Sequence, residues 1–203
     1  MRKMAMIVGM LLVSTTCVFA MPERTQKTDM GFQIGGLSPS AAHIDTGVYY
    51  GLNAAYGIND WFAVGVEGGY EDTKTRFTIG TNEHNPGLSY IPLFADLIVR
   101  HPMAEYSAVP YGVLGLGMLF MNDHGTGTLN DSHLKLETDN SFAIKLGAGV
   151  DWFINEKWAL NFEASYVWAA ADAKIVDLTT SDTVDSASLN YWTILGGLKY
   201  LFD

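Results

Sequence analysis

Apolar residues alternate with small or polar residues along most of the chain from Met30 onward. In the clearest stretch, from Trp158 to Trp168, the even positions read Trp, Leu, Phe, Ala, Tyr and Trp, and the odd positions read Ala, Asn, Glu, Ser and Val. Residues 142–152 and 192–202 repeat this order. Because successive side chains of a β-strand point to opposite faces, the period of two predicts strands with one apolar and one less apolar face.

The alternating stretches predict an all-β protein of eight strands. We expect these strands at residues 30–38, 44–57, 61–78, 88–100, 109–121, 139–154, 157–176 and 188–202. The connections at 57–60, 101–108 and 155–157 are short to moderate, whereas those at 80–87, 122–138 and 177–187 are long and polar. Short turns at one end, long loops at the other and an even strand number are typical of an antiparallel transmembrane β-barrel with both termini in the periplasm.

The same alternation also fits a soluble β-sandwich, in which the apolar face forms the core. Two features favour the barrel. Glycines are frequent on the less apolar face, where small residues relieve crowding inside a narrow barrel. Aromatic residues also recur at both ends of the apolar face, at a spacing that spans a membrane band of about 25 Å on a tilted strand.

These aromatic residues predict two girdles at the membrane surfaces. The periplasmic girdle comprises Tyr56, Phe62, Trp152, Trp158 and Phe202, and the outer girdle comprises Tyr50, Tyr70, Phe120, Trp168 and Trp192.

The first twenty residues have the pattern of an export signal. Met1-Arg2-Lys3 is positive, an apolar stretch follows, and small residues lead to Ala20, after which we expect cleavage. Cys17 raises a lipoprotein signal as an alternative, but the preceding Ser-Thr-Thr makes a poor lipobox. We therefore expect a signal peptide at 1–20, a short periplasmic segment at 21–29 and the barrel domain at 30–203.

Composition excludes several classes of protein. The formal net charge of the 203 residues is -10, which disfavours a nucleic-acid partner because phosphate binding needs a basic face. The single cysteine rules out an internal disulfide and a cysteine-based zinc site. No apolar run is long enough for a transmembrane helix, so an exported chain of this kind is either soluble or a membrane barrel.

If the apolar face contacts lipid, the other face lines the barrel interior. Its polar and charged residues are Asn53, Glu67, Glu71, Asp96, Arg100, Lys145, Asp151, Asn161, Glu163 and Lys199. Glu163 and Lys199 fall on adjacent predicted strands and are placed to pair. Buried charges must be paired or hydrated, so these residues form either a salt-bridge network that fills the barrel or a polar constriction that binds a solute. Eight strands leave no room for a wide aqueous channel.

The sequence contains no convincing catalytic or metal-binding arrangement. A lipid-modifying barrel enzyme needs a nucleophile beside a base at the membrane rim. All five histidines fall in predicted loops or turns instead: His43, His84, His101, His124 and His133. His124 and His133, with Asp123 and Asp131, are candidates for an external metal site, but their spacing follows no metal-ligand pattern. We expect no enzyme, no cofactor and no metal.

Several motifs resemble the OmpW family of small outer-membrane barrels. They lie at residues 91–97, 109–117 and 147–161, and residues 197–202 look like the C-terminal strand by which such barrels are recognised for assembly. Two features depart from the family pattern. Asp203 follows the last aromatic residue, and Asn190-Tyr191-Trp192 stands where a Pro-Trp pair is usual.

The resemblance implies an outer-membrane protein that lets small, largely hydrophobic molecules cross passively, without catalysis. It also implies contact with outer-membrane lipid and lipopolysaccharide, and with the barrel-assembly machinery through the C-terminal strand. We expect a monomer. The alternative is a non-transporting surface barrel, an adhesin or structural element, that acts through the loops at 80–87, 122–138 and 177–187.

Overall fold

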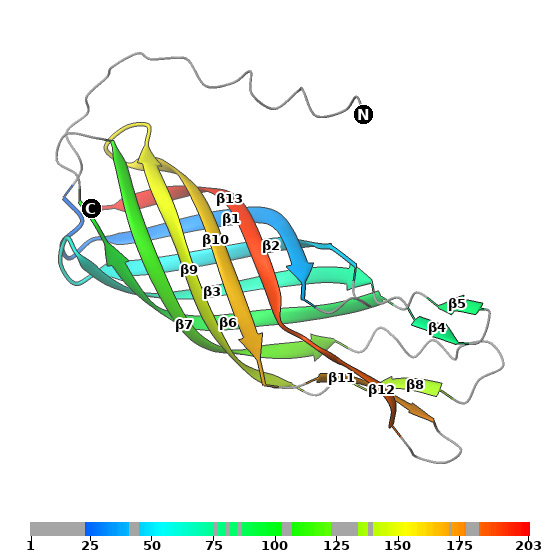
Figure 1. Cartoon of the computed structure of the whole chain (residues 1–203). Coiled ribbons are helices and arrows are strands. Elements are labelled where there is room, and N and C mark those ends of the chain that lie inside the picture. Colours follow the sequence, from blue (N-terminus) through cyan, green and yellow to red (C-terminus); the bar gives the residue numbers. More distant parts are fainter. Residues whose placement is uncertain are drawn as a thin grey trace, which may run out of the picture.

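The computed structural model describes residues 23–40, 45–74, 77–79, 82–84, 87–102, 107–122, 134–137, 140–170, 172–177 and 183–203. Within these residues, eight long strands form a closed antiparallel barrel (Figure 1). The strands are β1 (Thr28–Pro39), β2 (Gly47–Gly57), β3 (Phe62–Lys74), β6 (Gly87–Arg100), β7 (Ala108–Asn122), β9 (Ser141–Phe153), β10 (Trp158–Ala169) and β13 (Tyr191–Phe202). Each strand pairs with the next one along the chain, and β13 closes the barrel on β1.

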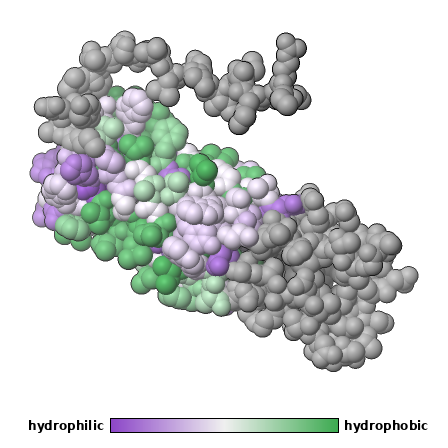
Figure 2. Space-filling view, viewed as in Figure 1, coloured by the Kyte–Doolittle hydropathy of each residue, from purple (hydrophilic) through white to green (hydrophobic). Residues whose placement is uncertain are grey.

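The two faces of the strands follow the alternation in the sequence. In β10, Ala159, Asn161, Glu163 and Ser165 are buried, and the residues between them are exposed. The outer wall is therefore largely apolar, and patches of green lie along the barrel in Figure 2. The closed barrel confirms the predicted fold class and excludes the sandwich.

Five further strands extend beyond the barrel, where the sequence predicted longer barrel strands and loops. β4 (Phe77–Ile79) pairs with β5 (Asn82–His84), and a three-stranded sheet contains β8 (Leu134–Glu137), β11 (Asp172–Asp177) and β12 (Thr183–Ser188). We call this side of the barrel the loop end, and the opposite side, with the short connections and the C-terminus, the turn end (Figure 1).

The predicted strand limits therefore need correction at the loop end. The strand expected at 61–78 leaves the barrel after Lys74, and the one expected at 157–176 leaves it after Ala169. Residues 71–76 are all polar and residues 169–171 are all alanine, so the period of two gives no sign of where either strand leaves the barrel. At the turn end β1 begins at Thr28, inside the segment expected to precede the barrel. Within the described ranges, no helix is long and apolar enough to cross a membrane.

Candidate functional site

The barrel interior near the turn end contains a cluster of ion pairs, which we call the turn-end network. Arg24 donates to Asp29 at 2.7 Å and to Asp151 at 2.8 Å. Arg100 also donates to Asp29, at 2.7 Å, and the ammonium of Lys199 lies 3.1 Å from Asp151. Each carboxylate thus has two cationic partners, and all five side chains are buried. Paired and hydrogen-bonded in this way, the charges can remain ionised away from water.

A second cluster, the mid-barrel network, surrounds Lys145 on β9. Its ammonium lies 2.8 Å from Glu67, 3.1 Å from Asp96 and 3.9 Å from Glu163. The hydroxyl of Tyr49 donates to Glu67 at 2.8 Å. One buried ammonium therefore stabilises three carboxylates that come from three different strands.

Asn161 and Tyr111 connect the two networks. The amide of Asn161 donates to Asp151 at 2.7 Å and to the Tyr111 hydroxyl at 2.8 Å, and Tyr111 donates to Glu163 at 2.9 Å. The side-chain amide of Gln33 donates to the side-chain oxygen of Asn161 at 2.6 Å. Hydrogen bonds and the 3.9 Å ion pair of Glu163 with Lys145 therefore connect the polar side chains through the turn-end half of the barrel.

Glycines on the inner face give the tyrosine rings room to lie against the wall. A Cβ atom at Gly69 would lie 2.6 Å from the ring of Tyr49, and one at Gly149 would lie 2.5 Å from the ring of Tyr111. These distances are shorter than any real contact of a Cβ atom. The small residues on this face are therefore needed where the aromatic rings approach the backbone.

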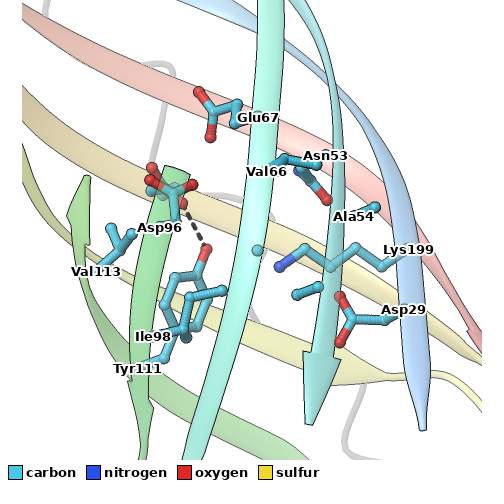
Figure 3. Close-up of a pocket in the computed structure, with 13 residues that line it drawn as sticks. Asp29, Asn53, Ala54, Val66, Glu67, Asp96, Ile98, Tyr111, Val113 and Lys199 are labelled. Atoms are coloured by element: carbon cyan, nitrogen blue, oxygen red, sulfur yellow. Dashed lines mark hydrogen bonds between the residues drawn. The ribbon is translucent and has the colours of Figure 1, made fainter. Parts of the chain in front are cut away.

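A small cavity remains between the two networks (Figure 3). Its volume is about 20 Å³, and Asp29, Glu67, Asp96, Tyr111 and Lys199 are among the residues that line it. This volume accommodates roughly one water molecule. The space is too small for an organic solute.

The interior near the loop end is different, because its side chains are mostly apolar. The buried cluster there comprises Leu37, Tyr90, Phe94, Leu119, Ala143, Val167, Leu189 and Tyr191. Glu71 is the acidic residue at this level, and it lies beside the hydroxyls of Tyr90 and Tyr191. The barrel therefore has a charged half toward the turn end and a largely apolar half toward the loop end.

The wall between β3 and β6 is interrupted near the loop end. Among the described pairs of this ladder, Gly68 pairs with Leu93 and Glu71 pairs with Tyr90, but neither Gly69 nor Tyr70 is paired with the opposite Pro92 or Ile91. Proline has no N–H to donate to a neighbouring strand.

The outer surface over this interruption is hollowed. An apolar groove of about 550 Å³ lies there, on the outward-facing wall of β1, β2, β3, β6 and β7. Its residues include Gly68, which has no side chain to fill it, and Pro92, Leu52, Leu93 and Phe120. The ladder gap and the groove therefore coincide.

All the polar residues predicted to line the interior face inward. Asn53 is half-buried and the others are buried: Glu67, Glu71, Asp96, Arg100, Lys145, Asp151, Asn161, Glu163 and Lys199. The ten predicted girdle residues all point outward and are at least 37% exposed. Their location at membrane surfaces stays a prediction.

The predicted pair of Glu163 with Lys199 is wrong. Lys199 lies opposite Ala159, and Glu163 lies opposite Leu195, so the two charges are four residues apart along the strands. Lys199 pairs with Asp151 instead, and Glu163 lies beside Lys145 and Tyr111. Counting residues from the turns does not give the stagger between strands in a barrel.

Sequence reasoning missed several interior residues. Arg24 and Asp29 fall in the segment expected to precede the barrel, and Tyr49 and Tyr111 belong to a residue type that also suits the lipid face. The inward position of the two tyrosines was visible in the sequence, because Tyr49 has the parity of Asn53 on its strand and Tyr111 has the parity of Gly115 and Gly117.

Asp203, which departs from the family pattern, connects three segments at the turn end. Its carboxylate lies 2.5 Å from the ammonium of Lys157 and 3.4 Å from that of Lys27. The hydrogen bond and charge of Lys157, with a further contribution from Lys27, lower the pKa of the Asp203 carboxyl. The residue therefore links the C-terminus to the segment before β1 and to the turn before β10.

Comparison with known proteins identifies the family of this barrel. Residues 8–202 match the family model described as outer membrane protein beta-barrel domain. The chain belongs to this family. No curated protein matches the chain.

Solved structures give the same result at the level of the fold. OprG from Pseudomonas aeruginosa has a TM-score of 0.77 at 15% identity, covering 89% of this chain and 98% of its own. The outer membrane protein AlkL has a TM-score of 0.58 at 14% identity, covering 88% and 92%. The outer membrane protein W of E. coli has a TM-score of 0.50 at 19% identity, covering 88% and 99%. The chain is thus an outer-membrane barrel, and the predicted likeness to OmpW-type small barrels is confirmed.

Two sequence predictions fall outside the described residues. These are the cleavage site after Ala20 and the candidate metal site of Asp123, His124, Asp131 and His133. Within the residues that are described, no group of three or more His, Cys, Asp or Glu side chains is placed to hold a metal ion.

Proposed function

We propose that this outer-membrane barrel lets small hydrophobic molecules pass between its loop-end interior and the membrane, through the wall between β3 and β6. The observation that carries this proposal is the coincidence of the ladder gap opposite Pro92 with the apolar groove outside it. The passage is passive, and it has no catalytic step.

The filled axis of the barrel supports a lateral route over an axial one. An apolar molecule moving along the axis would have to separate the ion pairs of Lys145 and then those of Asp151. Removing one partner from a buried ion pair costs about 3–5 kcal/mol, and an apolar solute supplies nothing in return. The charged half of the barrel therefore prevents such a solute from moving further along the axis.

The loop-end half is suited to hydrophobic molecules. Its interior is lined by apolar and aromatic side chains, so a hydrophobic solute that enters leaves water at a gain of about 25 cal/mol per Å² of buried apolar surface. From this level the gap at Gly69 and Pro92 leads to a groove that is itself apolar. A solute on this path meets mainly apolar side chains, and Glu71 is the acidic residue beside it.

The proposed orientation places the turn end in the periplasm and the loop end outside the cell. In this orientation the two sets of outward aromatic side chains lie at the two membrane surfaces, where amphipathic rings are favoured. The wall between them would contact outer-membrane lipid and lipopolysaccharide. The C-terminal strand β13 would be the segment read by the barrel-assembly machinery, and the barrel would act as a monomer.

The wall variant Pro92→Ala tests the proposal. It restores an N–H at the gap, and one added hydrogen bond is worth about 1 kcal/mol, or roughly a fivefold shift between an open and a closed wall. We expect uptake of an apolar fluorescent solute by cells carrying Pro92→Ala to fall by about this factor. Gly68→Leu, which fills the groove from outside, should act in the same direction.

Pro110→Ala is the matched control, because Pro110 lies on β7 in an unbroken part of the ladder with β9. Its uptake should equal that of the unchanged protein. Equal uptake by Pro92→Ala, Gly68→Leu and Pro110→Ala, with all three assembled in the membrane, would refute a route through this wall.

The alternative function, a surface adhesin, is favoured by a different observation. Two small sheets extend past the barrel at the loop end, and one of them combines β8, β11 and β12 from two separate connections. An adhesin should lose binding to host cells when these strands are removed and keep it in the Pro92→Ala variant. The transporter should show the reverse pattern.

A further inference from the structure

Residues 23–27, which precede β1, fold back across the turn end of the barrel. Gln26 donates its N–H to the carbonyl of Gly57 at 2.7 Å, and Gly57 donates to the carbonyl of Lys27 at 2.9 Å. The hydroxyl of Thr25 donates to Asp60 at 2.9 Å. The segment, which we call the strap, is thereby held against the turn between β2 and β3.

Arg24 points from the strap into the barrel. Its side chain is only 3% exposed, although the residue lies outside every barrel strand. The guanidinium bonds Asp29 and Asp151 and lies 5.3 Å from the ring centre of Phe153. A single side chain from the strap therefore bridges β1 and β9 inside the turn end.

The turn-end network does not need Arg24 for charge balance. Without it, Asp29 keeps Arg100 and Asp151 keeps Lys199, which leaves two neutral pairs. With it, two carboxylates face three cations. Arg24 also leaves its Nε without a hydrogen-bond partner in the described part of the chain. Arg24 thus helps to close the turn end of the barrel and is not needed to neutralise Asp29 and Asp151.

The strap also has a strained backbone. Gln26 has a φ of 59°, in the left-handed region that side-chain-bearing residues seldom adopt. Such a conformation persists only where surrounding contacts hold it, and here those contacts are Gly57, the Thr25–Asp60 bond and the ion pairs of Arg24. Loss of the contacts would relieve the strain and favour release.

We propose that residues 23–27 are a releasable strap that closes the turn end of the barrel, with Arg24 as its plug. When closed, the strap keeps bulk water and ions from the cavity between the two networks. When released, it gives them access to this cavity from the turn end. The closure concerns the barrel axis and does not depend on the lateral route.

The reactivity of a thiol introduced inside the barrel can show whether the strap is closed or released. Ala55 is 6% exposed and lines the cavity. In a Cys17→Ser background, Ala55→Cys gives the chain one cysteine. Its labelling rate with a small cationic thiosulfonate is measured on the full-length protein in membranes. We expect slow labelling with Arg24 present and labelling about tenfold faster after Arg24→Ala, a change equivalent to ~1.4 kcal/mol.

Lys27→Ala is the matched control in the same strap, because Lys27 is partly exposed and pairs at the surface with Asp203. It should leave the labelling rate unchanged. Thr25→Val removes the bond to Asp60 and leaves the ion pairs intact, so it should raise the rate by a smaller factor than Arg24→Ala.

Three results would contradict the proposal that the strap closes the turn end. The first is fast labelling with Arg24 present, which would show an open turn end. The second is equal labelling in the Arg24→Ala and Lys27→Ala variants. The third is failure of Arg24→Ala to assemble, shown by loss of the gel shift between unboiled and boiled samples, because the barrel would then need Arg24 in order to fold.

Discussion

At the scale of single residues, the barrel interior depends on a few side chains whose removal leaves others unpaired. Lys145 is the clearest case, because three buried carboxylates surround its ammonium. In contrast, Lys157 pairs with Asp203 at the surface, where water and salt weaken the attraction. A lysine in the barrel interior is therefore expected to contribute much more to stability than a lysine at the surface.

We expect Lys145→Met to destabilise the barrel by about 3–5 kcal/mol, because it leaves uncompensated buried charge. The temperature at which the folded band disappears from unboiled gel samples should fall by about 10 °C. Lys157→Met should change it by no more than a degree or two. Equal effects of the two substitutions would show that the interior network carries no special stability.

Two neighbouring glycines provide a second test at this scale. Gly69 faces the ring of Tyr49, and the hydrogen bond from Tyr49 to Glu67 holds this ring in place. In contrast, the atom nearest to a Cβ atom at Gly68 would be a side-chain carbon of Leu93, at 3.5 Å. Gly69→Ala should therefore cost about 1–3 kcal/mol, as expected for overpacking. Gly68→Ala should be close to neutral. The midpoint of the gel-shift transition measures both, and comparable losses would contradict the assigned faces of β3.

At the scale of elements, the alternation in the sequence predicted the eight barrel strands and the inward residues correctly. It did not predict where β3 and β10 leave the barrel, because six polar residues follow Tyr70 and three alanines follow Trp168, without a turn residue to mark the change. It also did not predict the pairing of Glu163, which depends on the stagger between β10 and β13. Arg24 lies outside the alternating pattern, so no periodicity pointed to it.

The extension strands should be dispensable for the barrel. β10 and β13 are still paired at Val167 and Tyr191, and Ala169 donates to the side chain of Asn190. Replacing residues 171–188 by Asn-Gly closes this connection with a short turn. We expect the shortened protein to keep its gel shift, with a midpoint within a few degrees of the full chain. Loss of the shift would show that the sheet of β8, β11 and β12 is part of the folded core.

At the scale of the whole molecule, the described part of the barrel combines an interior filled by ion pairs at the turn end with an interrupted ladder between β3 and β6. The turn-end half is filled by connected charges and covered by the strap, and the loop-end half is apolar. The gap at Pro92 lies on this apolar half and opens toward a groove in the membrane-facing surface. Under the proposed function, this distribution would separate the path of hydrophobic solutes from that of water and ions.

A reversible cross-link across the gap tests this central claim most directly. Tyr70 and Ile91 lie opposite each other at the gap, with both side chains outward, so Tyr70→Cys with Ile91→Cys in a Cys17→Ser background can form a disulfide across it. Val66→Cys with Ala95→Cys is the matched control, because this outward pair belongs to the intact ladder. Uptake of an apolar solute is measured before and after oxidation, and again after reduction.

We expect oxidation to abolish uptake by the Tyr70–Ile91 variant and reduction to restore it, with no change in the Val66–Ala95 variant. Uptake that continues through the oxidised Tyr70–Ile91 barrel would contradict a route through the wall between β3 and β6.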